Sequence, residues 1–279
     1  DLSNEYLNEI YKAGIRRLSI GIQSFQNEIL KKMNRRHDAV QAVEAVENAA
    51  KIGFKDISVD LIYGLPGLND NQWKADLKKV FKMPVQHLSA YHLTYHEGTP
   101  FYTWLRKGTL KALKEKESIS QFKTLILLAK QNRFEQYEIS NFAKDRKYSK
   151  HNSSYWMGVK YLGLGPSAHS YNGFSRSWNV SHIESYIMAI EAGLPYSEEE
   201  ILSENNMYNE YVLTRLRTIW GVSIHDVKKN LGEEKAIYFL NNVDKYIIAG
   251  MVMQNQGIYN LTEKGMFVSD EIMTNLMFI

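Results

Sequence analysis

Three polar side chains in the first quarter of the chain, Gln23, Arg35 and Asp60, could together hold a small ligand with a carboxylate, an amine and hydroxyl groups. An arginine can grip a carboxylate through two parallel hydrogen bonds. An aspartate can accept from hydroxyl or ammonium groups, and a glutamine amide can donate or accept. Spacing alone favours a simpler interpretation, with Arg35 in a surface pair with Arg36 and Gln23 in a loop. Asp60 is different, because a carboxylate inside an apolar strand needs a partner or a function.

A second group of residues, the segment His151-Asn-Ser-Ser-Tyr-Trp156, joins one histidine to an aromatic pair. A neutral imidazole is a good ligand for the iron of a flat macrocycle, and aromatic side chains suit packing against such a plane. As a bare pattern, however, one histidine near a Tyr-Trp pair is more typical of a surface or packing element.

The elements around the first group alternate between strand and helix. The sequence predicts strands at about 17–22, 57–62, 88–93 and 136–139, and helices over 39–52, from residue 70, and around 118–131. This alternation predicts right-handed βαβ units and a parallel sheet, which binds ligands at the carboxyl ends of its strands. Gln23 and the Gly64–Gly67 turn fall at those ends. Asp60 is out of phase with Val59 and Leu61, so we expect it to face away from the covering helices.

After residue 140 the pattern becomes irregular and aromatic, with one helix expected over 182–191. A turn at 193–195 and an acidic run at 198–200 predict a linker, which divides the chain into residues 1–192 and 193–279. Helices are expected at 206–219, 224–229 and 235–249, then a hairpin at 251–261 and a last helix capped by Thr262. Helices followed by a hairpin indicate a small winged-helix-like domain.

The composition, with 44% hydrophobic and 23% charged residues, is ordinary for a soluble globular protein. No apolar run approaches the length of a membrane span, and no apolar segment with a basic flank opens the chain as in a signal peptide. The chain has no cysteine, which excludes disulfides and thiolate metal sites within it. These features favour a cytoplasmic protein.

The net charge of +3 conceals an asymmetry. Residues 1–190 carry 27 Lys and Arg against 18 Asp and Glu, whereas residues 191–279 carry 7 against 13. The basic part could attract an anionic ligand, although a solvated lysine-rich surface explains it more simply. The acidic balance of the C-terminal part weighs against nucleic-acid binding there.

An ordered series of motifs resembles the HemN/HemW family of radical S-adenosylmethionine (SAM) proteins and covers nearly the whole chain. The motifs are Gly14–Phe25, Met33–Arg35, Asp60–Gly67, Leu88–Tyr91, Tyr137–Ala143, His151–Trp156, Tyr161–Gly165 and Ser167–His169. The family contains oxygen-independent coproporphyrinogen III oxidase and the haem chaperone HemW. The resemblance implies an α/β fold, with a partial (βα) barrel of the radical SAM type and a mainly helical, winged-helix-like C-terminal domain.

The same resemblance implies a SAM site. In the family, the residues that match Gln23, Arg35 and Asp60 contact SAM, whose carboxylate, amine and ribose suit these three side chains. Thr94 and His169 align more loosely with residues that line the same pocket.

The resemblance also implies a haem site, because a His-Asn-x-x-Tyr-Trp motif is associated with the HemW branch and with its haem binding, and the oxidase branch lacks it. Here the motif supplies His151, Asn152, Tyr155 and Trp156, with His151 as the expected ligand of the haem iron.

The chain departs from the family pattern at its start. The family begins with strands that carry a three-cysteine loop for a [4Fe-4S] cluster and a glycine-rich segment for the methionine end of SAM, and this sequence has neither. We therefore interpret the chain as a fragment of a longer protein that contains the cluster, and we do not expect it to be active alone.

Two functions follow from the resemblance. The leading hypothesis is a haem chaperone that binds haem and SAM and delivers haem to acceptor proteins. The alternative is an oxygen-independent coproporphyrinogen III oxidase of porphyrin biosynthesis. A third hypothesis, nucleic-acid binding by the winged-helix-like domain, is disfavoured by its acidic balance.

Overall fold

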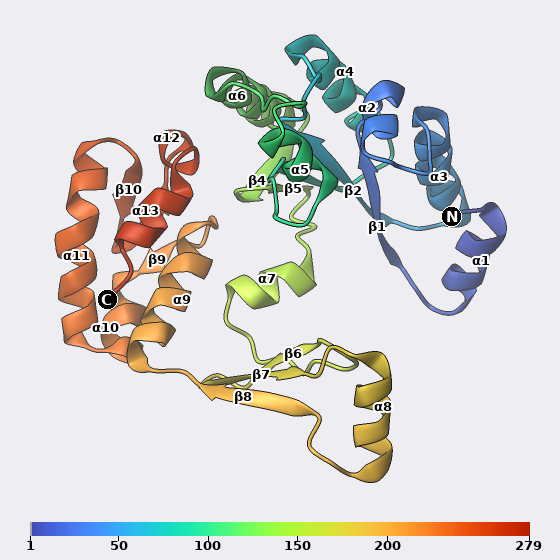
Figure 1. Cartoon of the computed structure of the whole chain (residues 1–279). Coiled ribbons are helices and arrows are strands. Elements are labelled where there is room, and N and C mark those ends of the chain that lie inside the picture. Colours follow the sequence, from blue (N-terminus) through green and yellow to red (C-terminus); the bar gives the residue numbers. More distant parts are fainter. Residues whose placement is uncertain (1) are drawn as a thin grey trace. The chain divides into compact units, whose positions relative to one another are not determined.

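The computed structural model describes residues 2–279 and divides the chain into two compact units, Asp1–Tyr148 and Ser149–Ile279. Each unit has secondary structure of its own (Figure 1). The expected boundary between residues 192 and 193 lies inside the second unit and stays a prediction.

The first unit contains a five-stranded sheet. Its strands are β1 (Arg17–Gln23), β2 (Asp56–Tyr63), β3 (His87–His92), β4 (Phe134–Glu138) and β5 (Asn141–Lys144), in the spatial order β1-β2-β3-β5-β4. The four strands predicted from the sequence are present, and β1, β2 and β3 are parallel as expected. The sheet is mixed rather than wholly parallel, because β5 lies between β3 and β4 and is antiparallel to both. At four residues, β5 is too short to show a periodic pattern in the sequence.

The helices of the first unit are α1 (Asn4–Lys12), α2 (Asn27–Lys32), α3 (Ala39–Ile52), α4 (Asp70–Val80), α5 (Pro100–Arg106) and α6 (Glu115–Gln131). Side-chain oxygens cap several N-termini; the Ser3 hydroxyl, for example, accepts from the Tyr6 N–H at 3.2 Å. Gly53 ends α3 with a φ of 118°, a conformation that favours glycine.

Helices α3, α4 and α6 pack on one face of this sheet (Figure 1). Val59 and Leu61 of β2 are fully buried on that face, and so is Trp73 of α4. The Trp73 indole N–H donates to the Gln121 carbonyl at 2.8 Å and so ties α4 to α6. The opposite face of the sheet carries polar side chains, and the candidate site in this unit lies there and at the end of β1.

The second unit begins with α7 (Lys150–Trp156), followed by a sheet that the sequence did not predict. Its strands are β6 (His169–Tyr171), β7 (Ser175–Asn179) and β8 (Ser197–Ile201), in that order and antiparallel, with α8 (Ile183–Ala192) between β7 and β8. The acidic run at 198–200, expected as a linker, lies in β8. Glutamate has a low strand propensity, but pairing along the whole of β7 overrides that preference.

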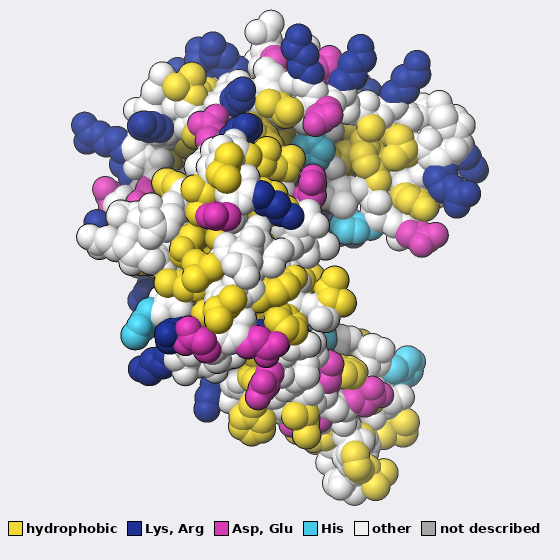
Figure 2. All heavy atoms as spheres, turned by 90° about the vertical axis from the view of Figure 1, so that its left-hand side faces the viewer, with side chains coloured by type: hydrophobic (Ala, Val, Ile, Leu, Met, Phe, Trp, Pro, Cys, Tyr) yellow, Lys and Arg dark blue, Asp and Glu magenta, His cyan; other side chains and the backbone are white. Residues whose placement is uncertain are grey.

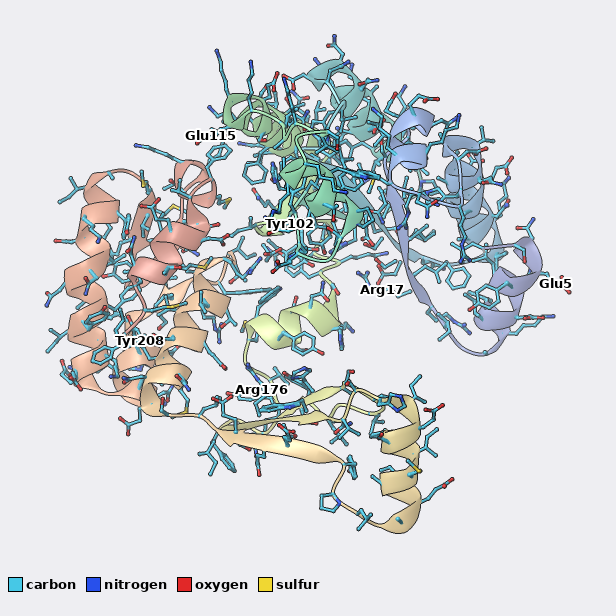
Figure 3. The ribbon with its side chains drawn as sticks, in the orientation of Figure 1. Glu5, Arg17, Tyr102, Glu115, Arg176 and Tyr208 are labelled. Carbon is cyan, nitrogen blue, oxygen red and sulfur yellow. The ribbon has the colours of Figure 1, made fainter. Side chains whose placement is uncertain are left out.

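The rest of the second unit matches the expected helices and hairpin. Its elements are α9 (Glu204–Leu216), β9 (Val222–Ser223), α10 (Ile224–Leu231), α11 (Glu233–Ile248), β10 (Val252–Asn255), β11 (Ile258–Leu261), α12 (Glu263–Met266) and α13 (Ser269–Asn275). Tyr208 of α9 is fully buried, and its hydroxyl donates to the Leu276 carbonyl at 3.0 Å (Figure 3). This bond fixes the C-terminal turn against α9.

In the view of Figure 2, Lys and Arg side chains gather at the top, where α4 and α6 lie in Figure 1. Within residues 2–279, no helix combines the length and the apolarity that crossing a membrane would require.

Candidate functional site

Two of the three predicted ligand-binding residues, Gln23 and Arg35, meet over Gly21 of β1, and the third, Asp60, lies on the neighbouring strand β2. Gly21 is the register partner of Asp60 on β2. A Cβ built on Gly21 would lie 2.6 Å from Gln23 Nε2 and 3.5 Å from Arg35 Nη2, so both side chains reach over this glycine. Arg35 Nη2 also donates to the Gly21 carbonyl at 3.4 Å. The absence of a side chain at Gly21 is what allows Gln23 and Arg35 to converge over β1, next to the strand that carries Asp60.

Gln23 owes its position to a turn that a buried carboxylate holds. Gln23 has a φ of 69°, which folds the chain back at the end of β1. Asp76 of α4, 1% exposed, accepts hydrogen bonds from the Ser24 hydroxyl at 2.7 Å, the Phe25 N–H at 3.1 Å and the Gln26 amide at 2.6 Å. Burial raises the pKa of Asp76, and these hydrogen bonds act in the opposite direction.

Sequence reasoning missed Asp76, although a signal was present. Asp76 follows Trp73 by three residues and precedes Leu77 and Val80, so it lies on the apolar stripe of α4. A carboxylate on such a stripe needs hydrogen-bond donors from another element, and the turn after β1 supplies them.

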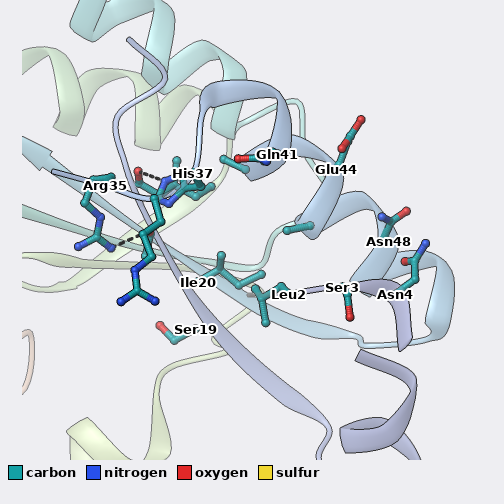
Figure 4. A pocket seen from close by; sticks show the side chains of 15 residues that line it. Leu2, Ser3, Asn4, Ser19, Ile20, Arg35, His37, Gln41, Glu44 and Asn48 are labelled. Carbon is teal, nitrogen blue, oxygen red and sulfur yellow. Dashed lines mark hydrogen bonds between the residues drawn. The ribbon is translucent and has the colours of Figure 1, made fainter. Parts of the chain in front are cut away.

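Arg35 lies in a short loop that is pinned to β1. Its N–H donates to the Leu30 carbonyl at 3.0 Å, and nearby His37 Nε2 lies 3.1 Å from the Ile22 carbonyl oxygen. Arg35, His37 and Ser19 line a cavity of about 580 Å³ along β1 (Figure 4). The Arg35 guanidinium is therefore available to a ligand at the carboxyl end of β1.

Asp60 faces away from the covering helices, as its phase in β2 predicts. The Ser19 hydroxyl donates to Asp60 Oδ1 at 3.2 Å, and Ser89 of β3 forms a second side-chain hydrogen bond. Burial raises the pKa of Asp60 above its usual range, while the two serines and the positive charge of Arg17 oppose that rise. Asp60 is thus a half-buried acceptor of hydrogen bonds from two neighbouring strands.

The same face of the sheet holds a histidine for which the sequence suggested no role. His87 is 1% exposed and lies between the Ser58 hydroxyl, 2.7 Å from Nδ1, and the Tyr137 hydroxyl, 2.7 Å from Nε2. Burial lowers the pKa of His87 to about 3, so the imidazole is neutral near pH 7. Its two hydrogen bonds cross-link β2, β3 and β4.

The two more loosely aligned SAM residues lie in different units of the chain. Thr94 is exposed in the segment just after β3. His169 opens β6 in the second unit, where its ring lies 6.3 Å from that of Trp178. The two residues therefore belong to different units.

The histidine motif forms most of α7. The Ser149 hydroxyl caps the helix by accepting from the Asn152 N–H. His151 is exposed, and its ring packs edge-on against Tyr155, one helical turn later, with centroids 4.9 Å apart. Tyr155 in turn meets Tyr161 at 4.7 Å. The structure therefore presents His151 on a chain of aromatic rings.

Trp156, the last residue of the motif, is held from another helix. The Arg217 guanidinium lies 4.5 Å from the Trp156 ring centroid, a cation–π contact between α7 and the end of α9. Trp156 Nε1 is buried and has no hydrogen-bond partner among the described residues. An unsatisfied buried donor of this kind is uncommon and often marks a functional position.

No resident iron–sulfur cluster can be assigned to these residues. The sequence contains no cysteine, and within residues 2–279 no group of three His, Cys, Asp or Glu side chains could hold a metal ion. The donors around Gly21, by contrast, suit a small ligand with a carboxylate and hydroxyl groups. The two candidate sites are thus a polar one in the first unit and an aromatic one in the second.

Comparison with protein families gives two matches. Residues 1–80 match the model of the Radical SAM superfamily, and residues 202–268 match the model of the HemN C-terminal domain. The first match includes Gln23, Arg35 and Asp60, and the second covers the whole region from α9 to α12.

Individual relatives extend the match over nearly the whole chain. A Bacillus subtilis protein named Heme chaperone HemW is 31% identical over 98% of this chain and 72% of its own length. A Lactococcus lactis protein of the same name is 28% identical over the same shares. Among solved structures, the Escherichia coli coproporphyrinogen III oxidase HemN, described as a radical SAM enzyme, matches 99% of this chain and 67% of its own with a TM-score of 0.80. At 19% identity, this likeness demonstrates a shared fold.

Proposed function

The chain belongs to the HemN/HemW family of radical SAM proteins, and we propose that it acts as a haem chaperone. In this proposal the second unit binds haem, the first unit contributes to a SAM site, and the haem passes to an acceptor protein.

The observation that carries the proposal is the exposed His151 on α7. The ring is held at its edge by Tyr155, so both the orientation and the accessibility of the imidazole suit an axial ligand. Asn152 and Trp156 complete the motif on the same short helix. The relatives that match the chain over 98% of its length are named haem chaperones, which supports the same function here.

The SAM site is proposed at Gly21. Arg35 would bind the carboxylate of SAM, Asp60 its ribose hydroxyls or its ammonium group, and Gln23 either of these. The space over Gly21, which a Cβ would fill and into which Gln23 and Arg35 reach, supports this assignment. Thr94 and His169 remain proposed contacts of lower priority, because one is exposed after β3 and the other lies in the second unit.

Membership of the radical SAM superfamily implies a [4Fe-4S] cluster in addition to SAM. Since this chain has no cysteine, we assign no cluster ligand and no redox step to its residues. The alternative function, coproporphyrinogen III oxidase, rests on likeness of fold to a relative of 19% identity, and no contact in this structure favours it.

A haem titration followed in the Soret region tests the proposal. We expect saturable binding to the full chain, and a shifted Soret maximum with about tenfold weaker binding for His151→Ala. His225→Ala is the matched control, because His225 is also exposed in the second unit but lies on α10, outside the motif. Equal binding by all three proteins would remove His151 from the site, and no binding by the unaltered chain would reject the proposal.

A further inference from the structure

A cavity of about 430 Å³ lies next to the histidine motif, entirely within the second unit. We call it the tyrosine pocket after four of its lining residues, Tyr155, Tyr161, Tyr171 and Tyr211. Its walls come from α7 and the segment after it, from β6 and β7, and from α9 and α10. The volume falls within the range of about 300–1,000 Å³ that is usual for small-molecule sites.

The lining of the tyrosine pocket suits a flat ligand. Tyr155 packs edge-on against Tyr161, and Tyr161 lies 6.1 Å from Tyr171, so three rings form a continuous wall. The flexible thioethers of Met157 and Met207 lie in the same lining. Aromatic rings and methionines adapt well to a broad apolar plane.

One cation in the tyrosine pocket lacks an ionic partner. The Arg215 guanidinium lies 5.5 Å from the ring centroid of Tyr211, and its Nη1 donates to Met157 Sδ, a weak acceptor. Within residues 2–279, no carboxylate lies at ion-pair distance from Arg215. An arginine held against an aromatic ring without a carboxylate is well placed to bind an anionic group of a ligand.

The two acidic residues in the lining are already engaged. Glu210 pairs with Arg176, whose Nη2 lies 2.9 Å from Glu210 Oε2; Figure 3 labels Arg176 on the three-stranded sheet. Asp226 forms a side-chain hydrogen bond with Tyr211. Glu210 is thus committed to Arg176, and Asp226 to the Tyr211 hydroxyl, and neither carboxylate forms an ion pair with Arg215.

We propose that the tyrosine pocket receives the edge of a tetrapyrrole, with one ligand carboxylate bound to Arg215 and the macrocycle against the tyrosine wall. This inference rests on the proposed haem-chaperone function and adds the part of the site that recognises the organic ring. His151 does not line the pocket and contacts it through Tyr155. Iron ligation by His151 and carboxylate binding by Arg215 are therefore separable.

Metal-free protoporphyrin IX is the probe that separates them, because it has the carboxylates and the ring but no iron. Its fluorescence is titrated with the full chain, with Arg215→Gln, with Arg215→Lys and with the control Lys229→Gln. Lys229 is exposed on α10 and does not line the pocket, so the control removes one positive charge from a neighbouring surface. The dimethyl ester of protoporphyrin IX, which has no free carboxylate, is titrated in parallel.

We expect Arg215→Gln to weaken binding of the free acid by about tenfold, because a charge-assisted hydrogen bond is lost. Arg215→Lys should lose less, since it keeps the charge, and Lys229→Gln should change binding by less than about twofold. The ester should bind the unaltered chain and Arg215→Gln alike. An equal loss for acid and ester, or no loss for either, would overturn the role of Arg215, and no binding of the free acid by the unaltered chain would overturn the pocket itself.

The two proposals fail in different ways. His151→Ala should weaken haem binding and leave protoporphyrin IX binding unchanged. If haem binds and the metal-free ring does not, the tyrosine pocket is rejected and the chaperone proposal stands. If Arg215→Gln weakens both ligands while His151→Ala weakens neither, the pocket stands and the ligand role of His151 is rejected.

Discussion

The turn after β1 is held by buried hydrogen bonds, whereas the histidine motif on α7 is held mainly by contacts between rings at the surface. Asp76 alone accepts three hydrogen bonds from the turn and is 1% exposed. His151 is exposed and meets Tyr155 edge-on. The turn after β1 is therefore fixed by buried hydrogen bonds that are shielded from water. The histidine motif is fixed by exposed ring contacts that a ligand could rearrange.

This difference corresponds to the ligands proposed for the two regions. A small polar molecule such as SAM is recognised by hydrogen-bond donors and acceptors whose positions vary little. The backbone that carries these groups therefore has to be rigid. A haem that must be received and passed on needs an accessible surface from which it can leave. We therefore expect removal of the buried polar groups that support the first region to change stability, and substitutions in the second region to change binding with little effect on stability.

The largest expected effect is at Asp76. Asp76→Ala removes the acceptor of three hydrogen bonds and leaves buried donors of Ser24 and Phe25 unsatisfied, so we expect a loss of about 3 kcal/mol in the free energy of unfolding. Urea denaturation of the full chain measures it. Glu47→Ala, at an exposed position on α3, should change stability by less than about 0.5 kcal/mol. A similarly small change in stability for Asp76→Ala would mean that the hydrogen bonds to Asp76 do not hold the turn after β1.

The second effect is a pH dependence that arises from His87. The pKa of His87 is about 3 in the folded chain, against 6.5 for an unperturbed histidine, so between these values the unfolded state binds more protons. The contribution of neutral, buried His87 to the free energy of unfolding is fully present above pH 6.5. This contribution is lost as the pH falls below that value, by up to about 1.4 kcal/mol per pH unit.

Urea denaturation between pH 5 and pH 7 measures this slope. His87→Gln should flatten it, whatever its effect on stability at pH 7, whereas the exposed control His225→Gln should leave the slope as it is. An unaltered slope in His87→Gln would show that His87 is not the group responsible.

A smaller effect is expected at Gly21. Gly21→Ala places a Cβ 2.6 Å from Gln23 Nε2, the mobile end of a flexible side chain, so the free energy of unfolding should change by less than about 1 kcal/mol. SAM binding, measured by calorimetry, should weaken by about tenfold because the Gln23 amide is displaced. Gln23→Ala should have the same effect, and the double variant should add nothing. If the losses of SAM affinity in the two single variants add up in the double variant, Gly21→Ala does not act by displacing the Gln23 amide.

The smallest effect on stability is expected at His151. His151→Ala removes an exposed ring with one aromatic contact, and the free energy of unfolding should change by less than about 0.5 kcal/mol. Thermal unfolding of the unaltered chain and the variant checks this. A loss of 2 kcal/mol or more would show that His151 is structural and that the contrast between the two regions is wrong.

The sequence predicted what depends on local periodicity. Four strands of the first unit, and the phase by which Asp60 faces away from the covering helices, follow from the alternation of the sequence. It did not predict β8, because three consecutive glutamates form a strand only when a partner such as β7 supplies the pairing.

The tyrosine pocket was missed for a related reason. Tyr155, Tyr171 and Tyr211 are far apart along the chain and come from α7, β6 and α9, so no local spacing reveals that they share one cavity. The motif that begins at His151 marked the neighbourhood, but the placement of the Arg215 guanidinium against Tyr211, without a carboxylate partner, is apparent only when its surroundings in three dimensions are known.

The most direct test of the account compares haem titrations of the unaltered chain, His151→Ala and Arg35→Gln, followed in the Soret region. The account predicts a shifted Soret band and weaker binding for His151→Ala, and a curve for Arg35→Gln that overlays that of the unaltered chain, because Arg35 belongs to the polar site at β1. Equal weakening by Arg35→Gln, or no change with His151→Ala, would contradict the assignment of haem to the second unit.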